Sequence, residues 1–391
     1  YINDMVLPQM LIGKVLFAGR PHAKIVNIDI SAAERLPGVH AVLTGKDAAG
    51  LKFGFVRDNV PLKEKVLCEH DEIAAVAADT EEIALRALDL IKVEYQDLPG
   101  VFTPEIGREA SAPQLRESFP DNKSLRFEFK HGDLAAAEAD SDFIADNVFR
   151  PHHVTHCCMG TSCAIADFDN NGKLTIWTQT QYPYNYKMDL APALGITPGD
   201  IRVIQPPVGG AFGSKLDVYP YEPIAALLAR KTGRPVKVIH SREDEFRASP
   251  TRQAAIIHMR TGCKRDGTLT FRTANVLLDN GAYTSWGPTI PVIMMRTTSG
   301  HYRVPVVDFK AQAIYTNNPY AGSFRGYGNV QTTFATAQQM DILADQVDMD
   351  PLAFHLKNAQ KSGETTPQKS FLRECALAEC LEPADQATDN S

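Results

Sequence analysis

A glycine-rich segment at residues 206–215, PPVGGAFGSK, is the part of the sequence best suited to hold a ligand through its backbone. Its three glycines surround Phe212, permit positive φ angles and let backbone N–H groups approach a bound group with no Cβ in the way. The residue order fits neither the phosphate loop of nucleotide-hydrolysing proteins nor the Rossmann fingerprint. On these residues alone, a plain tight turn is as good an interpretation as a binding loop.

A second segment of similar character lies at residues 320–329, YAGSFRGYGN. Two glycines flank Tyr327 directly after Arg325, whose planar guanidinium suits a phosphate or an oxo group. The alternative is that Arg325 pairs with a carboxylate and that Tyr327 packs in the core. Taken alone, this segment favours that alternative.

Imidazoles and thiols gather in one short stretch, a composition that can bind zinc. These side chains are His152, His153, His156, Cys157, Cys158 and Cys163. Their spacing matches no zinc signature, and thiols that alternate along a strand usually belong to a core. We therefore predict no metal ion bound directly by side chains of this chain.

Each glycine-rich segment is expected to connect a strand to a helix. Strands are predicted at residues 201–204 and 307–315, and helices at residues 222–231 and 334–347. Alternating runs broken by Asn-Gly and Asp-Gly signals predict two hairpins. Their strands are 164–168 with 174–180, and 255–261 with 269–278.

The first hundred residues alternate strand and helix signals. Residues 26–30 and 73–78 read as strands, and capping signals at Ser31 and Thr80 begin two helices. Asp350 followed by proline begins another helix near the end. The predicted organisation is a domain at 1–101, a linker at 102–125, a larger α+β domain at 126–383 and a tail at 384–391.

The composition excludes several classes of function. The chain has 391 residues and a net charge of -7, with no basic cluster for nucleic acid and no apolar run of membrane-span length. Its seven cysteines are an odd number without ferredoxin spacing. We therefore expect a cytoplasmic protein, with any iron–sulfur cluster on another polypeptide.

The two glycine-rich segments together resemble the molybdopterin-binding subunit of the xanthine dehydrogenase and aldehyde oxidoreductase family. In that family the corresponding segments read Gly-Gly-Gly-Phe-Gly-Gly-Lys and Ala-Phe-Arg-Gly-Phe-Gly. Residues 21–25, 36–39 and 93–95 resemble landmarks of its N-terminal α/β-hammerhead domain. The resemblance implies an α+β fold in which the hammerhead domain is followed by the first molybdopterin-binding domain.

The resemblance also implies which residues contact the cofactor. These cofactor-binding residues are Gly210, Ala211, Phe212, Gly213, Phe324 and Arg325. The backbone of the first four would lie against the dithiolene and the oxo ligand of molybdenum. A Cβ added at Gly213 is expected to intrude on the space that the cofactor occupies.

Three further side chains are candidate catalytic residues by the same resemblance. Gln181 matches a glutamine that hydrogen-bonds the oxo group, although it could be a solvent-facing loop residue. Arg296 matches the arginine with which xanthine dehydrogenases hold a substrate carbonyl, and which aldehyde oxidases generally lack; the alternative is a structural ion pair. Tyr327 stands where a family phenylalanine stacks on an aromatic substrate.

Some positions depart from the family pattern. Leu216 replaces a glutamate that binds purine in xanthine dehydrogenases, which makes a purine substrate doubtful. Asp217 is expected to cap the helix that follows. Gly160 replaces a common glutamate, with a consequence that the sequence does not reveal. The family's general base lies in a Gly-x-Gly-Glu segment that is absent here.

The implied activity is the hydroxylation of an aromatic N-heterocycle, with water as the oxygen source. The implied cofactor is molybdopterin with molybdenum, in a dinucleotide form, with iron–sulfur clusters and FAD on partner subunits. Residues 317–323 resemble the larger molybdopterin-binding chain of nicotinate dehydrogenases, whose large subunit is split. A second chain would then carry the catalytic glutamate. The alternatives are an aldehyde oxidoreductase subunit and a cofactor-free scaffold subunit.

Overall fold

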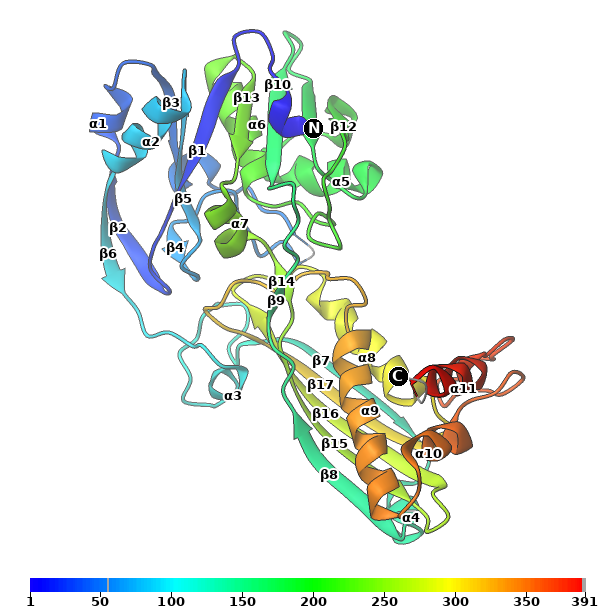
Figure 1. The fold of residues 1–391 in the computed structure, drawn as a ribbon. Helices are drawn as coiled ribbons and strands as arrows, with labels where there is room; N and C mark the ends of the chain where they lie inside the picture. The colour runs from blue at the N-terminus through cyan, green and yellow to red at the C-terminus, as the bar shows by residue number, and fades with distance from the viewer. Residues whose placement is uncertain (55, 389–391) are drawn as a thin grey trace.

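The fold consists of two bodies joined by a narrow crossing of the chain (Figure 1). The structure is a computed structural model that describes residues 1–54 and 56–388. The upper body contains a seven-stranded sheet. In spatial order its strands are β12 (Ile201–Ile204), β11 (Leu174–Thr178), β10 (Cys163–Phe168), β13 (Val236–Ile239), β1 (Leu11–Phe17), β5 (Glu72–Ala78) and β3 (Val39–Thr44).

The lower body is a long five-stranded sheet with helices on one face (Figure 1). Its strands, in order, are β7 (Lys123–His131), β17 (Val306–Tyr315), β16 (Leu269–Gly281), β15 (Ala255–Cys263) and β8 (Phe143–Phe149). The helices packed with it are α8 (Ile290–Gly300), α9 (Asn329–Gln346) and α10 (Pro351–Asn358). Alternate strand residues and one side of α8 and α9 form its core, which includes Met294, Met340 and Phe309.

Smaller elements complete the two bodies. A three-stranded sheet is formed by β4 (Lys65–Val66), β2 (Ala23–Asp29) and β6 (Lys92–Asp97), and β14 (Thr251–Arg252) pairs with β9 (Val154–Thr155) where the bodies meet. The other helices are α1 (Ser31–Glu34), α2 (Glu81–Asp89), α3 (Pro104–Gly107), α4 (Leu134–Ala139), α5 (Pro183–Leu194), α6 (Tyr221–Thr232), α7 (Arg242–Ala248) and α11 (Leu377–Thr388). Short 3-10 turns lie at η1 (Ile2–Asp4), η2 (Gly45–Ala48), η3 (Pro198–Asp200) and η4 (Gly287–Thr289).

Both predicted hairpins are confirmed, as antiparallel pairs of β10 with β11 and of β15 with β16. The caps at Thr80 and Asp350 are also confirmed, since their side chains accept from the N–H groups of Ile83 and Ala353. The cap predicted at Ser31 is wrong. There the Asp29 carboxylate accepts from the Ser31 N–H, and α1 has no side-chain cap.

The division into domains stays a prediction, but the structure adds two facts to it. Strands β1, β3 and β5, from the first 101 residues, share one sheet with strands from residues 163–239. The predicted tail at 384–391 overlaps α11, which continues to Thr388, and residues 389–391 lie outside the described residues. None of the described helices is both long and apolar enough to cross a membrane.

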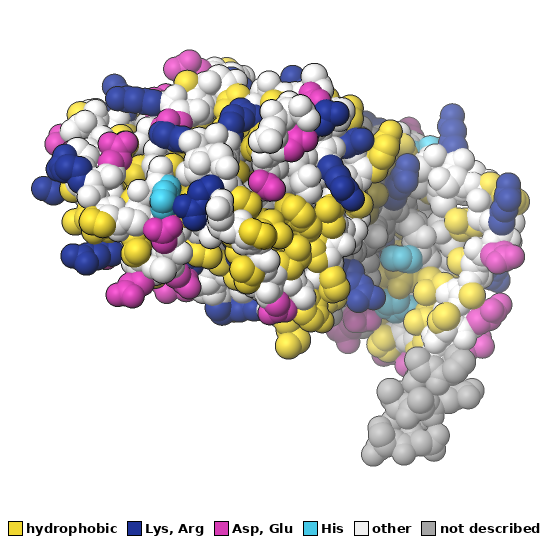
Figure 2. Space-filling view, turned by 90° about the horizontal axis from the view of Figure 1, so that it is seen from above, with side chains coloured by type: hydrophobic (Ala, Val, Ile, Leu, Met, Phe, Trp, Pro, Cys, Tyr) yellow, Lys and Arg dark blue, Asp and Glu magenta, His cyan; other side chains and the backbone are white. Residues whose placement is uncertain are grey.

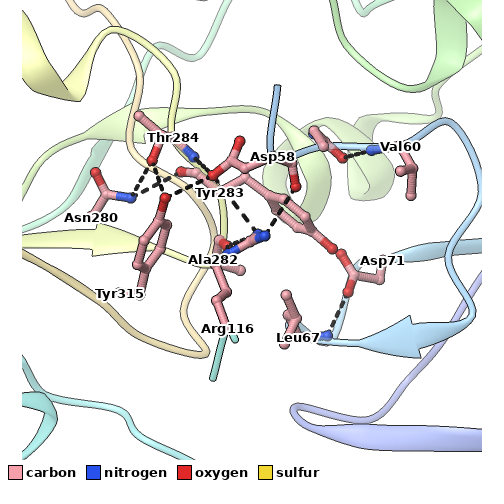
Figure 3. A network of polar contacts seen from close by, with 11 residues as sticks. Asp58, Val60, Leu67, Asp71, Arg116, Asn280, Ala282, Tyr283, Thr284 and Tyr315 are labelled. Atoms are coloured by element: carbon pink, nitrogen blue, oxygen red, sulfur yellow. Dashed lines mark hydrogen bonds and ion pairs between the residues drawn. The ribbon is translucent and has the colours of Figure 1, made fainter. Parts of the chain in front are cut away.

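The segment predicted as a linker is anchored at Arg116 to the loop around Asp58 and to Ala282, directly after β16 (Figure 3). The Arg116 guanidinium donates to the backbone oxygens of Asp58 and Ala282. It also lies over the rings of Tyr283 and Tyr315, 4.8 and 4.9 Å from their centroids. These contacts hold residues 102–125 as a fixed joint between the hammerhead-like region and the lower body.

Candidate functional site

The two glycine-rich segments lie against each other. We call residues 206–215 the first loop and residues 320–329 the second loop. The first loop follows β12 and leads to α6, and the second follows β17 and leads to α9. The N–H of Arg325 donates to the backbone oxygen of Phe212 at 2.8 Å. Segments more than a hundred residues apart in the sequence therefore form one site.

Gly213 is the point of closest approach between the loops. It has a φ of +108°, and a Cβ added there would lie 2.5 Å from the backbone oxygen of Ser323. Glycine is therefore required both for the backbone conformation and for the contact. The first group that this Cβ would meet is the backbone of the second loop, and whether it would also intrude on cofactor space stays a prediction.

The first loop carries a run of unused hydrogen-bond donors. The N–H groups of Gly209, Gly210, Ala211 and Phe212 donate to no residue that the structure describes. The first three of these residues are half-buried, and Phe212 is exposed with a φ of +52°. Successive free amides in a turn form a concavity with positive potential, which suits an anionic or oxo group.

The Gln181 side chain is hydrogen-bonded to this loop. Its Oε1 accepts from the N–H of Gly213 at 3.0 Å, and its own N–H donates to the backbone oxygen of Lys215 at 2.8 Å. Its Nε2 donates to no described residue. The side-chain amide is therefore fixed at one end and available as a neutral donor at the other.

The second loop is held from beneath by two buried side chains. The ring of His156 packs on Phe324 at 4.2 Å between centroids, with its Nε2 2.8 Å from the backbone oxygen of Ser323. Arg252 lies over the same ring at 4.2 Å and donates to the backbone oxygen of Arg325 at 2.9 Å. Burial lowers the pKa of His156, while the contacts of its ring nitrogens with the backbone oxygens of Ser323 and Pro250 oppose that shift.

Arg325, Arg296 and Tyr327 leave their polar groups free. Both guanidiniums are exposed and form no hydrogen bond or ion pair with a described residue. This argues against the structural ion pair that was the alternative for each arginine. Tyr327 is half-buried against the core of the lower body, as its alternative predicts, while its hydroxyl donates to no described residue.

Helix α8, which carries Arg296, is bonded to the second loop through Thr297 and Asn329, and the turn before it is bonded to the residue that follows the first loop. A Cβ at Gly328 of the second loop would lie 3.0 Å from the backbone oxygen of Ile290, at the start of α8. Just before this helix, the indole N–H of Trp286 donates to the backbone oxygen of Leu216 at 3.0 Å. The structure thus brings the helix to the site, although it shows no contact from the Arg296 side chain to either loop.

Lys215 is a site residue that sequence reasoning missed. The side chain is 2% exposed, and its Nζ donates to the backbone oxygens of Gly160, Gly210 and Val208 at 2.8, 3.0 and 3.4 Å. Lysine at the end of a glycine-rich loop was visible in the sequence. Its position inside the fold was not, because buried lysines are rare.

The structure explains Gly160 and corrects Asp217. The Gly160 N–H donates to Gly209 O at 2.9 Å, and a Cβ at 160 would lie 2.8 Å from Val208 O, so only glycine allows this pairing. Asp217 does not cap α6, which begins at Tyr221. Its carboxylate accepts from the Ser285 hydroxyl at 2.6 Å, and burial raises its pKa to about 7.

The imidazoles and thiols at residues 152–163 are directed to separate partners. His153 lies 3.2 Å from a carboxylate oxygen of Asp279, and the Cys158 thiol contacts Ala211 O and the Ser214 hydroxyl in the first loop. No group of three or more His, Cys, Asp or Glu side chains within the described residues could hold a metal ion. This stretch supports the two loops.

Comparison with known proteins identifies the domains around this geometry. The family model for the molybdopterin cofactor-binding domain matches residues 115–359. The model for the a/b hammerhead domain of aldehyde oxidase and xanthine dehydrogenase matches residues 1–99. The α+β fold, with a hammerhead domain before a molybdopterin-binding domain, is therefore confirmed.

Individual relatives carry the same two domains. The chain is 37% identical over 374 residues to a probable xanthine dehydrogenase subunit of Bacillus subtilis, covering 94% of this chain and 49% of the relative. It is 34% identical over 388 residues to the nicotinate dehydrogenase large molybdopterin subunit of Eubacterium barkeri, covering 98% and 91%. The chain thus spans about half of the first relative and nearly all of the second.

A solved structure agrees with this assignment. Quinoline 2-oxidoreductase from Pseudomonas putida 86 superposes with a TM-score of 0.93 at 28% identity, over 100% of this chain and 52% of that one. The free amides of the first loop and the glycines that let it approach a ligand fit a molybdopterin centre, as the domain match requires. The chain belongs to the xanthine dehydrogenase and aldehyde oxidase family of molybdopterin-binding proteins.

Proposed function

We propose that this chain is the molybdopterin-binding part of an oxidoreductase that hydroxylates an aromatic N-heterocycle with oxygen from water. The observation that carries the proposal is the run of four free backbone amides in the first loop, beside the free Nε2 of Gln181. These donors lie where a negatively charged dithiolene and an oxo group would be held without a charged side chain. The bound molybdenum would supply the two-electron redox chemistry.

In this proposal each chain residue has a defined task. The N–H groups of Gly210 and Ala211 and the backbone around Phe212 and Gly213 position the cofactor. Gln181 would hold the oxo group of the centre through its free amide hydrogens. Phe324 and Arg325 complete the cofactor contacts, since their backbone is held by His156 and Arg252 while the Arg325 side chain remains free.

Arg296 supports a heteroaromatic substrate over a simple aldehyde. An exposed guanidinium without an acidic partner can neutralise charge that develops on a ring far from the metal. Tyr327 would flank the ring, with a hydroxyl that can add a hydrogen bond. The substrate class of the nicotinate dehydrogenase relative, and the presence of Leu216 in place of glutamate, favour a nicotinate-like over a purine-like heterocycle.

The proposed assembly includes three further components. A second molybdopterin-binding chain would supply the catalytic glutamate, and iron–sulfur and FAD subunits would accept the electrons. Figure 2 shows hydrophobic side chains gathered on the surface of the upper body, a feature common at protein interfaces. We also place the protein in the cytoplasm, because all seven cysteines are free thiols. For the pterin we expect the dinucleotide form, which the family resemblance implies.

Metal analysis and a substrate panel test this function. The complex, purified with its natural partners, should contain about one molybdenum per copy of this chain. It should oxidise nicotinate faster than xanthine and much faster than a simple aldehyde. Molybdenum without heterocycle turnover but with aldehyde turnover would favour an aldehyde oxidoreductase. A complex without molybdenum would contradict the enzyme assignment and favour a scaffold.

A further inference from the structure

Lys215 is a buried cation with no acidic partner. Its side chain is 2% exposed, and no carboxylate among the described residues lies within ion-pair distance of its Nζ. Its three hydrogen-bond acceptors are all backbone oxygens, two in the first loop and one at Gly160. Burying an unpaired charge is costly, and burial lowers the pKa of the Lys215 ammonium, an effect that the nearby Glu245 carboxylate opposes.

The bonds from Lys215 determine where the first loop's amides point. In a trans peptide, the N–H of one residue points opposite to the C=O of the residue before it, and none of the described peptide bonds is cis. Because Lys215 draws in the oxygens of Val208 and Gly210, the N–H groups of Gly209 and Ala211 must point away from the buried ammonium. Both belong to the run of amides without a described acceptor.

We propose that Lys215 is a positioning residue for the cofactor. It turns the amides of Gly209 and Ala211 toward the bound group and places a positive charge without an ion-pair partner behind them. This inference rests on the proposed function, because it assumes that the first loop receives molybdopterin. It adds a role for a side chain that faces inward and touches the cofactor only through the loop.

The positive charge has a second consequence. A fixed cation near a redox centre stabilises the more electron-rich state, and the effect is strong where water is excluded. Lys215 therefore raises the reduction potential of the centre in addition to orienting the loop. A side chain that only filled space, or only stabilised the fold, would leave that potential unchanged.

The test compares Lys215→Met, Lys215→Arg and Lys237→Met in the complete complex. Lys237 is a matched control, because it is also buried and donates to a backbone oxygen, that of Asn3 at 2.8 Å, outside both loops. Molybdenum and pterin content per chain, the thermal midpoint and the molybdenum reduction potential followed by EPR are measured for each variant. Activity is not needed for any of these readouts.

We expect Lys215→Met to lower molybdenum content by about ten-fold, since charge-assisted hydrogen bonds that aim the loop are lost. Lys237→Met should keep the wild-type content, with a similar fall in thermal midpoint. The remaining centre in Lys215→Met should have a lower reduction potential, and Lys215→Arg, which keeps the charge, should retain the wild-type potential at reduced content.

Two results would overturn the inference. One is wild-type content and potential in Lys215→Met. The other is equal loss of cofactor in Lys215→Met and Lys237→Met, which would make the effect one of general stability. If Lys215→Met does not fold, Lys215→Gln takes its place, because its amide can still donate to the loop oxygens but carries no charge. Its centre should have a lowered reduction potential, and a wild-type potential there would overturn the inference. A wild-type complex without molybdenum would instead contradict the proposed function.

Discussion

The two loops meet at one site but are held in different ways. The first loop is fixed from within by the Lys215 ammonium, which bonds its backbone oxygens and leaves its amides free. The second loop is fixed by side chains from elsewhere, with His156 and Arg252 contacting both its backbone and the Phe324 ring. The first loop therefore presents backbone, and the second presents side chains.

This difference assigns the two loops different tasks. Backbone donors are the same whatever the side chains, so the first loop suits the invariant part of the chemistry, the cofactor. Besides Arg325, which is assigned to the cofactor, the second loop and α8 present Tyr327 and Arg296, whose type can change without disturbing the backbone. Substitutions in the first loop should therefore affect cofactor content or stability, and substitutions of Tyr327 or Arg296 should affect substrate choice.

The largest effect is expected at Arg296. Replacing it with Met should lower kcat/KM for a heteroaromatic substrate by about 10²–10³, because charge on the ring loses its partner. Arg296→Lys should retain only part of the wild-type kcat/KM, since the lysine ammonium is a point charge without the planar two-pronged geometry of the guanidinium. The measurement is steady-state kinetics at equal molybdenum content. A simple aldehyde serves as control, and unchanged heteroaromatic turnover would show that side chains near the second loop do not select the substrate.

Gly213→Ala tests the contact between the loops. The added Cβ would clash with Ser323 O and the residue would keep an unfavourable φ, so unfolding should become about 4 kcal/mol easier. Gly233→Ala is the matched control. It has a φ of +62° with nothing near its Cβ, and should cost only about 1 kcal/mol. Chemical denaturation measures both, and equal costs would mean that the loops are not in close contact.

Much of this fold was predictable from local patterns. Period-two alternation and Asp-Gly or Asn-Gly turns located both hairpins, and threonine or aspartate before a helix located two caps. These signals depend on neighbours in the sequence. The sharing of one sheet by residues 11–78 and 163–239 was not predictable, because strand pairing across long separations leaves no local pattern.

The site divides in the same way. Resemblance placed Gln181 and the two loops, and the structure brings them together. Lys215 and the Arg252–Phe324 stack were missed, since a buried lysine or arginine looks like any other cation in a sequence. Asp217 was assigned to a helix cap from its spacing alone, while its actual partner, Ser285, comes from a distant loop.

A smaller effect concerns pH on the first-loop side. Glu222, at the start of α6, is 2% exposed, and burial raises its pKa from 4.5 to about 7. The folded state therefore holds the proton more tightly than the unfolded state. Its contribution to stability is complete below about pH 4.5 and is lost as the pH rises through about 7.

Glu222→Gln should remove that pH dependence. The amide oxygen can still accept from the Tyr219 N–H, and the amide nitrogen can donate to the Thr178 hydroxyl, which can also accept, while no charge forms. Between pH 4.5 and pH 8 the wild type should lose about 3 kcal/mol more of its free energy of unfolding than the variant does. Denaturation at several pH values measures this, with a remaining slope expected from Asp217, whose pKa is also raised to about 7. An unchanged profile would show that the Glu222 carboxylate is charged in the fold.

The smallest effect is expected at Gln181, whose side-chain oxygen is bonded to the first loop while its Nε2 stays free to donate. Gln181→Ala removes the acceptor for the Gly213 N–H, a single hydrogen bond at an exposed side chain worth about 1 kcal/mol. The free energy of unfolding should fall by no more than that, because Lys215 still holds the first loop. The fall in turnover at equal molybdenum content, expressed as a free energy, should be larger than the loss in the free energy of unfolding, since the free Nε2 is lost as well. Gln181→Glu is the control, because it keeps an acceptor for Gly213 but provides no donor. If Glu restores both stability and turnover, Gln181 serves only to hold the first loop, and the loop's backbone alone contacts the cofactor.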